Sequence, residues 1–163
     1  MVKDPFLNGT TPDVLADDAD STAVETQGDW EHVERFEIPQ PYKGTYFISK
    51  EKSEKGQWLR FKANIKKPGS YGVYLFHPIV LGWKKPYSPN TTFSIKANGE
   101  IAQKSIDFSH LPINQNWGEW VDLGSYKFSG TGEEFVELVG EKSLPPLVAD
   151  AIIFVWEDEN NQN

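Results

Sequence analysis

Apolar residues recur at every second position in most segments between residues 14 and 156, and no segment keeps a helical period for three turns. The alternation is regular at residues 57–65, where Leu59, Phe61, Ala63 and Ile65 fall on one face. Strands that bury one face must stack as two sheets to make a core. The pattern therefore predicts an all-β chain.

The alternation and the turn residues together outline the strands. Asn98-Gly99 predicts a type I′ hairpin, because both central residues tolerate positive φ. The Ser-Gly-Thr-Gly stretch at 129–132 predicts a second hairpin. The fold class predicted is a jelly-roll-like β-sandwich of about eight to nine antiparallel strands. Two brief strands are expected at 14–16 and 45–49. The clear strands are expected at 30–36, 57–65, 71–79, 91–97, 101–108, 120–128, 135–139 and 147–156.

The formal net charge of −8 is concentrated at the two ends of the chain. Residues 1–29 carry −6, residues 157–159 carry −3, and residues 30–156 carry +1. Nothing resembles the basic stripe that duplex nucleic acid requires, so nucleic acid is excluded as a partner. No apolar run reaches the roughly 18 residues of a membrane span.

The ends also set the expected organisation of the chain. Residues 1–13 are predicted to be a linker or leader, 14–156 a binding module, and 157–163 a flexible acidic tail. The chain has no cysteine and no apolar signal segment near its start. We expect a monomeric module within a larger exported chain, secreted or at the cell surface; a complete cytosolic protein is the alternative.

The order of tight and long connections predicts where unusual residues gather. Tight connections at 66–70, 97–100 and 129–133 follow every second strand. If successive strands alternate in direction, these turns share one end of the sandwich. The longer connections then share the opposite end, at 50–56, 80–90, 109–119 and 140–146.

Two of the long connections are rich in aromatic and amide side chains. Sugar rings stack on flat exposed aromatics, and amides hydrogen-bond hydroxyl groups. Lys84 and Lys85, with Lys142 nearby, suit an anionic polysaccharide. A second interpretation, in which Trp83 or Trp117 folds back over the core, stays open. The predicted ligand-binding residues are Trp83, Lys84, Lys85, Tyr87, Asn90, Asn114, Asn116 and Trp117.

Five phrases in order along the chain carry a resemblance to a known family. They are Ala16-Asp17-Asp18-Ala19-Asp20 followed by Gly28-Asp29-Trp30, then Tyr42-Lys43-Gly44-Thr45-Tyr46, Pro68-Gly69-Ser70-Tyr71-Gly72-Val73-Tyr74, Trp120-Val121-Asp122-Leu123-Gly124-Ser125-Tyr126-Lys127-Phe128 and Val148-Ala149-Asp150-Ala151-Ile152-Ile153-Phe154. Together they resemble the golvesin C-terminal or xanthan-lyase carbohydrate-binding-like domain, over residues 14–156.

The resemblance implies a jelly-roll-like sandwich attached to extracellular polysaccharide lyases, hydrolases and surface proteins, with a role in carbohydrate binding. The chain departs from the family where a His-Asp pair usually follows the glycine turn, because it reads Phe47-Ile48-Ser49-Lys50 there. The segment at 80–90 also differs. Ligand specificity is therefore not implied.

Four acidic residues are candidate ligands of a structural calcium ion. Asp17, Asp18 and Asp20 form a dense oxygen cluster of the kind that Ca²⁺ prefers. Asp150 lies on the inward face of an apolar strand, where a carboxylate needs donors or a metal. In similar β-sandwich modules the first and last strands lie together and hold calcium. The alternative is that Asp150 accepts backbone N–H bonds and the aspartate run is a solvated turn.

The sequence carries no pattern of catalytic residues. His32, His77 and His110 lack metal-site spacing, and His77 is predicted to lie at the rim. No nucleophile elbow or phosphate-binding loop is present. A non-catalytic carbohydrate-binding module is therefore the leading hypothesis. The alternatives are an adhesion or spacer domain that binds protein or nothing, and a small β-sandwich polysaccharide lyase.

Overall fold

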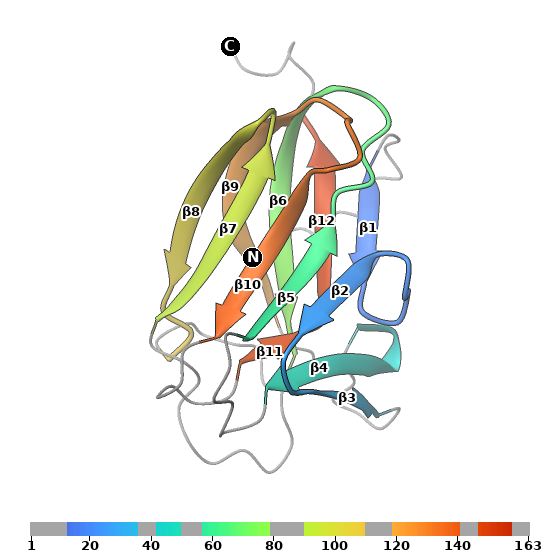
Figure 1. Ribbon diagram of the computed structural model, residues 1–163, viewed down its shortest axis with the longest axis vertical. Coiled ribbons are helices and arrows are strands. Elements are labelled where there is room, and N and C mark those ends of the chain that lie inside the picture. Colours follow the sequence, from blue (N-terminus) through green and yellow to red (C-terminus); the bar gives the residue numbers. More distant parts are fainter. Residues whose placement is uncertain are drawn as a thin grey trace.

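The computed structural model describes residues 13–35, 42–49, 57–78, 90–109, 119–140 and 147–157, which contain twelve strands in three antiparallel sheets (Figure 1). The four-stranded sheet has the order β1 (Val14–Asp17), β12 (Ala151–Trp156), β6 (Gly69–His77) and β9 (Glu119–Phe128). The five-stranded sheet has the order β2 (Val24–Gln27), β5 (Gln57–Lys62), β10 (Phe135–Gly140), β7 (Thr91–Ala97) and β8 (Glu100–Ile106). The small sheet has the order β11 (Val148–Ala149), β4 (Thr45–Ser49) and β3 (Trp30–Glu34).

The core lies between the two larger sheets, which face each other as the layers of a sandwich (Figure 1). Leu59 and Phe61 of β5 are fully buried in it, as are Tyr71 and Leu75 of β6. Phe128 packs edge-on against Phe154, with ring centroids 5.4 Å apart. The inward face predicted at residues 57–65 is confirmed, and the fold is the all-β, jelly-roll-like sandwich that the alternation predicts.

Helical structure in the described ranges consists of one short 3₁₀ turn, η2 (Tyr42–Gly44). A membrane-crossing helix, which needs a long apolar segment, is not found among these residues.

One predicted hairpin is confirmed and the other is wrong. β7 and β8 pair across Asn98 and Gly99, whose φ angles of 52° and 77° are those of a type I′ turn. The strands before and after 129–132 do not pair: β9 pairs with β6, and β10 pairs with β5 and β7. The segment crosses from one sheet to the other. Its glycines allow a tight turn but carry no information about which sheet the next strand joins.

The chain has more strands than expected for two reasons. β2 lies at the edge of the five-stranded sheet and its residues Glu25, Thr26 and Gln27 are exposed, so its sequence has no apolar alternation. The strand predicted at 147–156 is divided at Asp150: β11 pairs with β4 in the small sheet, and β12 pairs with β1 and β6.

Strand register gathers the connections at two opposite ends. At one end, Phe135 lies opposite both Lys62 and Lys96, and Gly69 lies opposite Phe128. The three tight connections therefore share this end, as predicted; we call it the turn end (upper end of Figure 1). At the other end, His77 pairs with Glu119, Gly140 with Gln57, and Thr91 with Ile106. We call it the loop end.

Glu134, which is buried, links two of the three tight connections, those at 97–100 and 129–133, to the residue that follows β5. Its carboxylate accepts hydrogen bonds from the backbone N–H groups of Asn98 (2.7 Å), Ser129 (2.9 Å) and Gly130 (2.7 Å). Its carbonyl accepts the N–H of Ala63 at 2.9 Å. Burial alone would raise the pKa of this carboxyl, but the hydrogen bonds outweigh burial and hold the pKa below its ordinary value of 4.5.

We expect Glu134→Gln to lower the free energy of unfolding by about 1–3 kcal/mol near neutral pH, because an amide leaves backbone donors without an acceptor. The folded state favours the ionised form, so the contribution is present above the ordinary carboxyl pKa and is lost as pH falls through the lower folded pKa. The difference between parent and variant should therefore shrink in acid. Urea unfolding at neutral and acidic pH measures it, with the exposed Glu133→Gln as control. Equal losses at both pH values would contradict this role.

Candidate functional site

Most of the predicted ligand-binding residues lie outside the described residues. These are Trp83, Lys84, Lys85, Tyr87, Asn114, Asn116 and Trp117. Asn90 is described, and it is exposed one residue before β7, at the loop end. The strand ends that flank the segments 79–89 and 110–118 meet at this same end.

An aromatic cluster lies at the loop end on the outer side of the four-stranded sheet. The Trp120 ring at the start of β9 is 5.2 Å from the Phe76 ring and 5.7 Å from the Tyr42 ring, all centroid to centroid. Phe76 is buried, whereas Trp120 and Tyr42 are half-buried. None of these three residues is among the ligand-binding residues predicted from the sequence, although Trp120 alternates with the inward-facing Val121. Half-exposed rings of this kind offer faces for sugar stacking.

His77 is at the end of β6, but it is not a rim residue, so that prediction is wrong. Its side chain shares the inward face with Tyr71, Val73 and Leu75 and is only 2% exposed. The imidazole packs 4.7 Å from the Phe108 ring, centroid to centroid. Burial lowers the pKa of His77 to about 4, so the ring is neutral at physiological pH. The buried His77 side chain is therefore not placed to act as a catalytic group at the surface.

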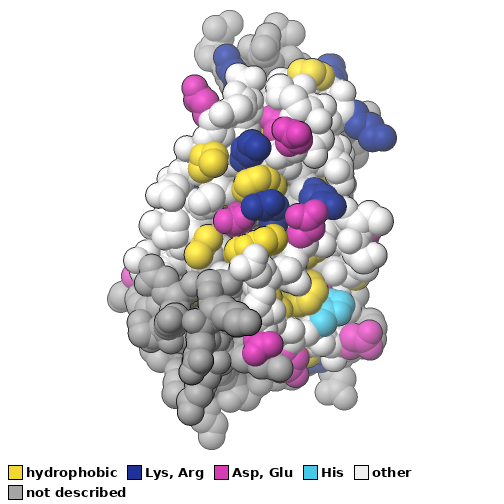
Figure 2. All heavy atoms as spheres, in the orientation of Figure 1, with side chains coloured by type: hydrophobic (Ala, Val, Ile, Leu, Met, Phe, Trp, Pro, Cys, Tyr) yellow, Lys and Arg dark blue, Asp and Glu magenta, His cyan; other side chains and the backbone are white. Residues whose placement is uncertain are grey.

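The outer face of the five-stranded sheet carries a second group of hydrophobic, basic and acidic side chains (Figure 2). The Arg60 guanidinium lies 3.9 Å from the Phe135 ring centroid and 4.7 Å from that of Trp58. It also donates to Glu137 at 2.6 Å. Val139, paired with Trp58, is 38% exposed. This face is a second candidate surface for a ligand. The Arg60 guanidinium, however, is paired with Glu137 and covers the rings of Trp58 and Phe135.

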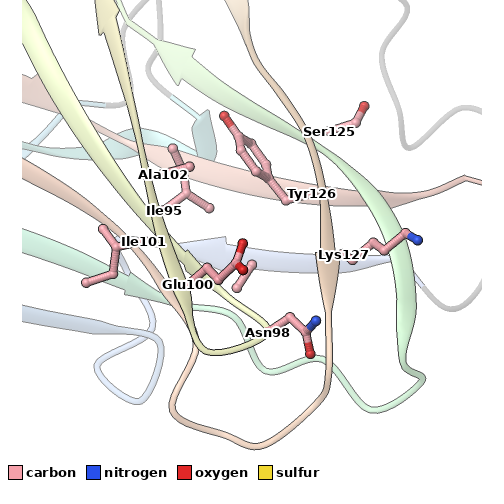
Figure 3. A pocket seen from close by; sticks show the side chains of 9 residues that line it. Ile95, Asn98, Glu100, Ile101, Ala102, Ser125, Tyr126 and Lys127 are labelled. Carbon is pink, nitrogen blue, oxygen red and sulfur yellow. The ribbon is translucent and has the colours of Figure 1, made fainter.

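A groove of about 320 Å³ opens between the β7–β8 hairpin and β9 (Figure 3). Asn98, Glu100 and Lys127 contribute polar groups, and Tyr126 contributes a ring whose hydroxyl donates to the Leu123 carbonyl at 2.6 Å. The groove reaches the turn end, where Asn98 and Lys127 lie. It therefore lies at the opposite end from Asn90, the predicted ligand residue that the structure describes.

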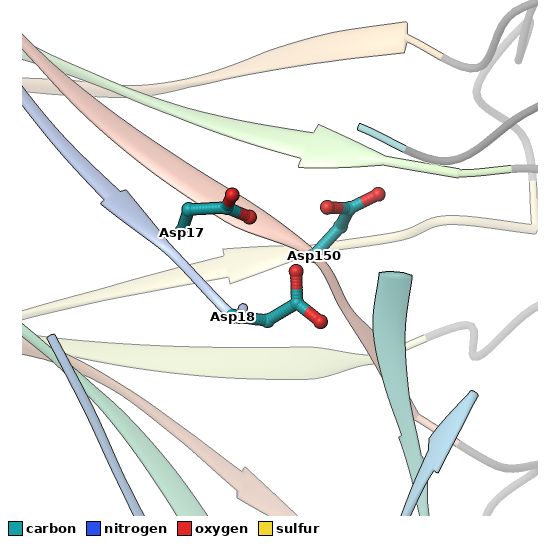
Figure 4. A group of neighbouring side chains, drawn as sticks. All are labelled: Asp17, Asp18 and Asp150. Atoms are coloured by element: carbon teal, nitrogen blue, oxygen red, sulfur yellow. The ribbon is translucent and has the colours of Figure 1, made fainter. Parts of the chain in front are cut away.

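Three of the four predicted calcium ligands come together (Figure 4). Asp17 ends β1, Asp18 follows it, and Asp150 stands between β11 and β12. The pairing of β1 with β12 places Asp17 opposite Ala151, and the Asp18 N–H donates to the Asp150 carbonyl at 3.0 Å. One carboxylate oxygen from each residue lies within 4.8 Å of the other two. We call this group the acidic cluster.

The acidic cluster is buried and only partly hydrogen-bonded. Asp17, Asp18 and Asp150 are 5%, 4% and 0% exposed. Asp18 has Oδ2 at 2.8 Å from His32 Nε2 and accepts the Thr45 hydroxyl at Oδ1. Asp150 Oδ2 accepts the Tyr42 N–H at 2.8 Å. Asp17 Oδ1 and Asp150 Oδ1 are buried without a hydrogen-bond partner.

The electrostatics of the acidic cluster follow from this burial. Burial raises the pKa of Asp18 to about 7; Asp17 acts in the same direction, while hydrogen bonds from His32 and Thr45 oppose it. Burial also raises the pKa of Asp150 well above its ordinary value, with the nearby Asp18 charge adding to the effect and the Tyr42 N–H opposing it. In the absence of a counter-charge, the cluster therefore resists full ionisation.

Asp20 is not part of the acidic cluster. It is exposed, and its Oδ1 accepts the Thr22 N–H at 2.9 Å and the Thr22 hydroxyl at 2.7 Å. The aspartate run thus divides into a buried part, Asp17 and Asp18, and a solvated turn at Asp20. Asp150 accepts a backbone N–H, as the alternative interpretation held, while its second oxygen stays without a donor.

Comparison with known proteins finds a family and several similar folds. The family model of the Golvesin C-terminal domain matches residues 14–156. A Paenibacillus xanthan lyase superposes with a TM-score of 0.73 and 22% identity, covering 90% of this chain and 13% of the lyase. The chain thus spans a small part of that enzyme, and the likeness is one of fold. No curated protein matches the chain.

Two further structures are more distant. The C-terminal CBM6 of a marine laminarinase from Zobellia galactanivorans has a TM-score of 0.44 at 12% identity, over 88% of this chain and 99% of that one. The CBM22-1–GH10 modules of a Clostridium thermocellum endo-1,4-β-D-xylanase have a TM-score of 0.42 at 13% identity, over 83% of this chain and 26% of that one.

We expect Asp150→Ala to lower the free energy of unfolding by about 1–3 kcal/mol, because the Tyr42 N–H loses its acceptor at a buried position. Urea unfolding measures the loss, with and without EDTA. Glu31→Ala removes an exposed carboxylate from β3 and should change the value by less than about 0.5 kcal/mol. An Asp150 variant as stable as the parent under both conditions would show that the carboxylate is not structural.

Proposed function

The chain belongs to the Golvesin C-terminal domain family, and from that premise we propose that it is a non-catalytic carbohydrate-binding module of a larger, exported polysaccharide-degrading enzyme. It would hold its partner enzyme close to the polymer, raising the effective concentration of the substrate without chemistry of its own. The similar xanthan lyase supports this arrangement, because the matched part is 13% of that chain, the share of an accessory module.

The observation that carries the proposal is the register of the strands. It brings the strand ends that flank residues 79–89 and 110–118 to the loop end, beside the half-exposed rings of Tyr42 and Trp120. We therefore propose that Trp83, Tyr87 and Trp117 supply stacking faces at this end, and that Asn90, Asn114 and Asn116 supply hydrogen bonds. Lys84 and Lys85 favour an anionic sugar in an otherwise acidic chain.

The arrangement of the acidic residues favours binding over catalysis. Glycoside hydrolysis needs two carboxylates with a sugar between them. Asp17, Asp18 and Asp150 are together but almost fully buried, so a polymer has no access to them. Of the two histidines in the described residues, His77 is buried and neutral, and His32 is hydrogen-bonded to Asp18. A polysaccharide lyase activity therefore finds little support in this part of the chain.

A glycan array followed by calorimetry tests the function, with xanthan as an anionic probe and xylan as a neutral one. Binding without product formation supports the module. Release of unsaturated oligosaccharides would instead establish a lyase, and silence across the array would favour the adhesion or spacer hypothesis.

We expect Trp83→Ala and Trp117→Ala each to weaken glycan binding by about 1–3 kcal/mol, by analogy with the stacking of bases on aromatic side chains. Trp58→Ala is the matched control on the outer face of the five-stranded sheet and should bind like the parent. If Trp58→Ala loses binding while both loop variants keep it, the ligand site is on the sheet face instead.

Lys84→Ala should weaken binding of an anionic glycan mainly at low salt, because exposed charges are screened over about 8–10 Å at physiological ionic strength. Titrations at two salt concentrations measure the effect. Lys127→Ala removes an exposed lysine at the turn end and should leave affinity unchanged at both. A Lys84 effect that is independent of salt would argue against an electrostatic role.

A further inference from the structure

We propose that the acidic cluster of Asp17, Asp18 and Asp150 binds one calcium ion at the junction of β1, β12 and the small sheet. The proposal concerns the stability of the fold and does not depend on carbohydrate binding.

The spacing of the carboxylates fits a single ion of this size. Ca²⁺ binds oxygen at about 2.3–2.6 Å, so two ligands on opposite sides of one ion lie about 5 Å apart. One oxygen from each of Asp17, Asp18 and Asp150 lies within 4.8 Å of the other two. The three side chains extend from different backbone positions toward a common centre (Figure 4).

The second observation is independent of the spacing. Asp17 Oδ1 and Asp150 Oδ1 are buried oxygens with no hydrogen-bond donor. A buried acceptor without a partner is destabilising, and a buried charge without one is more so. Glu134 is another buried carboxylate, and there the fold supplies three backbone N–H donors. In the acidic cluster, a bound cation would provide the partner that these two oxygens do not receive from backbone N–H groups.

The remaining oxygens are held in the way that metal-binding carboxylates are. His32 and Thr45 engage Asp18, and the Tyr42 N–H engages Asp150 Oδ2, which fixes both side chains and leaves Asp150 Oδ1 for an ion. Partners of this kind orient the ligands of a metal site.

The chemistry of the ligands selects calcium. The set consists of carboxylate oxygens, which suit hard cations, while zinc prefers sulfur and nitrogen. The nearest nitrogen ligand, His32 Nε2, is already hydrogen-bonded to Asp18. Mg²⁺ loses its water reluctantly and demands near-ideal octahedral geometry. A buried group of three carboxylates is better matched to the flexible coordination of Ca²⁺.

The test is to strip the 163-residue chain with EDTA, dialyse it, and titrate it with CaCl₂, MgCl₂ and NaCl of matched ionic strength. Calorimetry should find one Ca²⁺ per chain. At a hundredfold excess over Kd, Ca²⁺ should raise Tm by about 5–10 °C, as expected for a ligand that binds only the folded state. Mg²⁺ should give a smaller shift. No binding of Ca²⁺ at millimolar concentration, or an equal shift with NaCl, would overturn the proposal, because the cluster would then be held by shared protons.

Three variants locate the ion. Asp17→Asn and Asp150→Asn should weaken Ca²⁺ binding at least about tenfold and abolish the Tm shift. Asp20→Asn changes the exposed aspartate of the same run and should leave both Ca²⁺ binding and the Tm shift unchanged. If Asp150→Asn fails to fold, Asp17→Asn decides, because Asp17 Oδ1 has no protein donor to lose. Parent-like Ca²⁺ binding by Asp17→Asn, or its loss in Asp20→Asn, would overturn the assignment.

Discussion

Burial of one apolar face of each large sheet against the other is the constraint on which the remaining structure depends. Leu59 and Phe61 on one side, and Tyr71, Leu75 and Phe154 on the other, are withdrawn from water only when the sheets stack. At about 25 cal/mol per Å² of apolar surface, these large side chains supply most of the favourable free energy of folding. Stacking requires the chain to pass repeatedly from one sheet to the other, and each passage leaves backbone groups at the end of the sandwich that need partners.

The two ends of the sandwich provide these hydrogen-bond partners in different ways. At the turn end, Glu134 is surrounded by amide donors, and its pKa is lowered although burial alone would raise it. Near the loop end, Asp18 and Asp150 each accept fewer hydrogen bonds than Glu134 and lie beside other carboxylates. Burial raises the pKa of both. Both sites contain buried carboxylates. Only the second lacks donors for its oxygens, so only the second has a reason to take a cation.

The sequence predicts well whatever depends on alternation and local turn chemistry. The inward face of β5, the type I′ turn at Asn98-Gly99 and the burial of Asp150 all follow from spacing along a single strand. The approach of Asp17 and Asp18 to Asp150 follows from placing the first strand beside the last.

What depends on pairing across the fold could not be predicted in the same way. The glycine-rich turn at 129–132 looks like a hairpin locally, and only the partners of β9 and β10 reveal a crossover. The edge strand β2 has no alternation to detect. The contact of Tyr42 with Asp150 joins residues 108 positions apart, and the Arg60 contacts with Trp58 and Phe135 need two neighbouring strands in register.

Tyr42 connects the buried acidic cluster to the surface where ligand binding is proposed. Its N–H is fixed by Asp150, while its ring packs against Phe76 and Trp120 at the loop end. An ion that orders Asp150 would therefore also fix the position of this ring, since the backbone of Tyr42 cannot shift without losing its acceptor. Stacking on a sugar gains most when the aromatic surface is already in place, because less conformational freedom is lost on binding. The proposed calcium site would therefore help to order the aromatic surface of the proposed polysaccharide site at the same end of the sandwich.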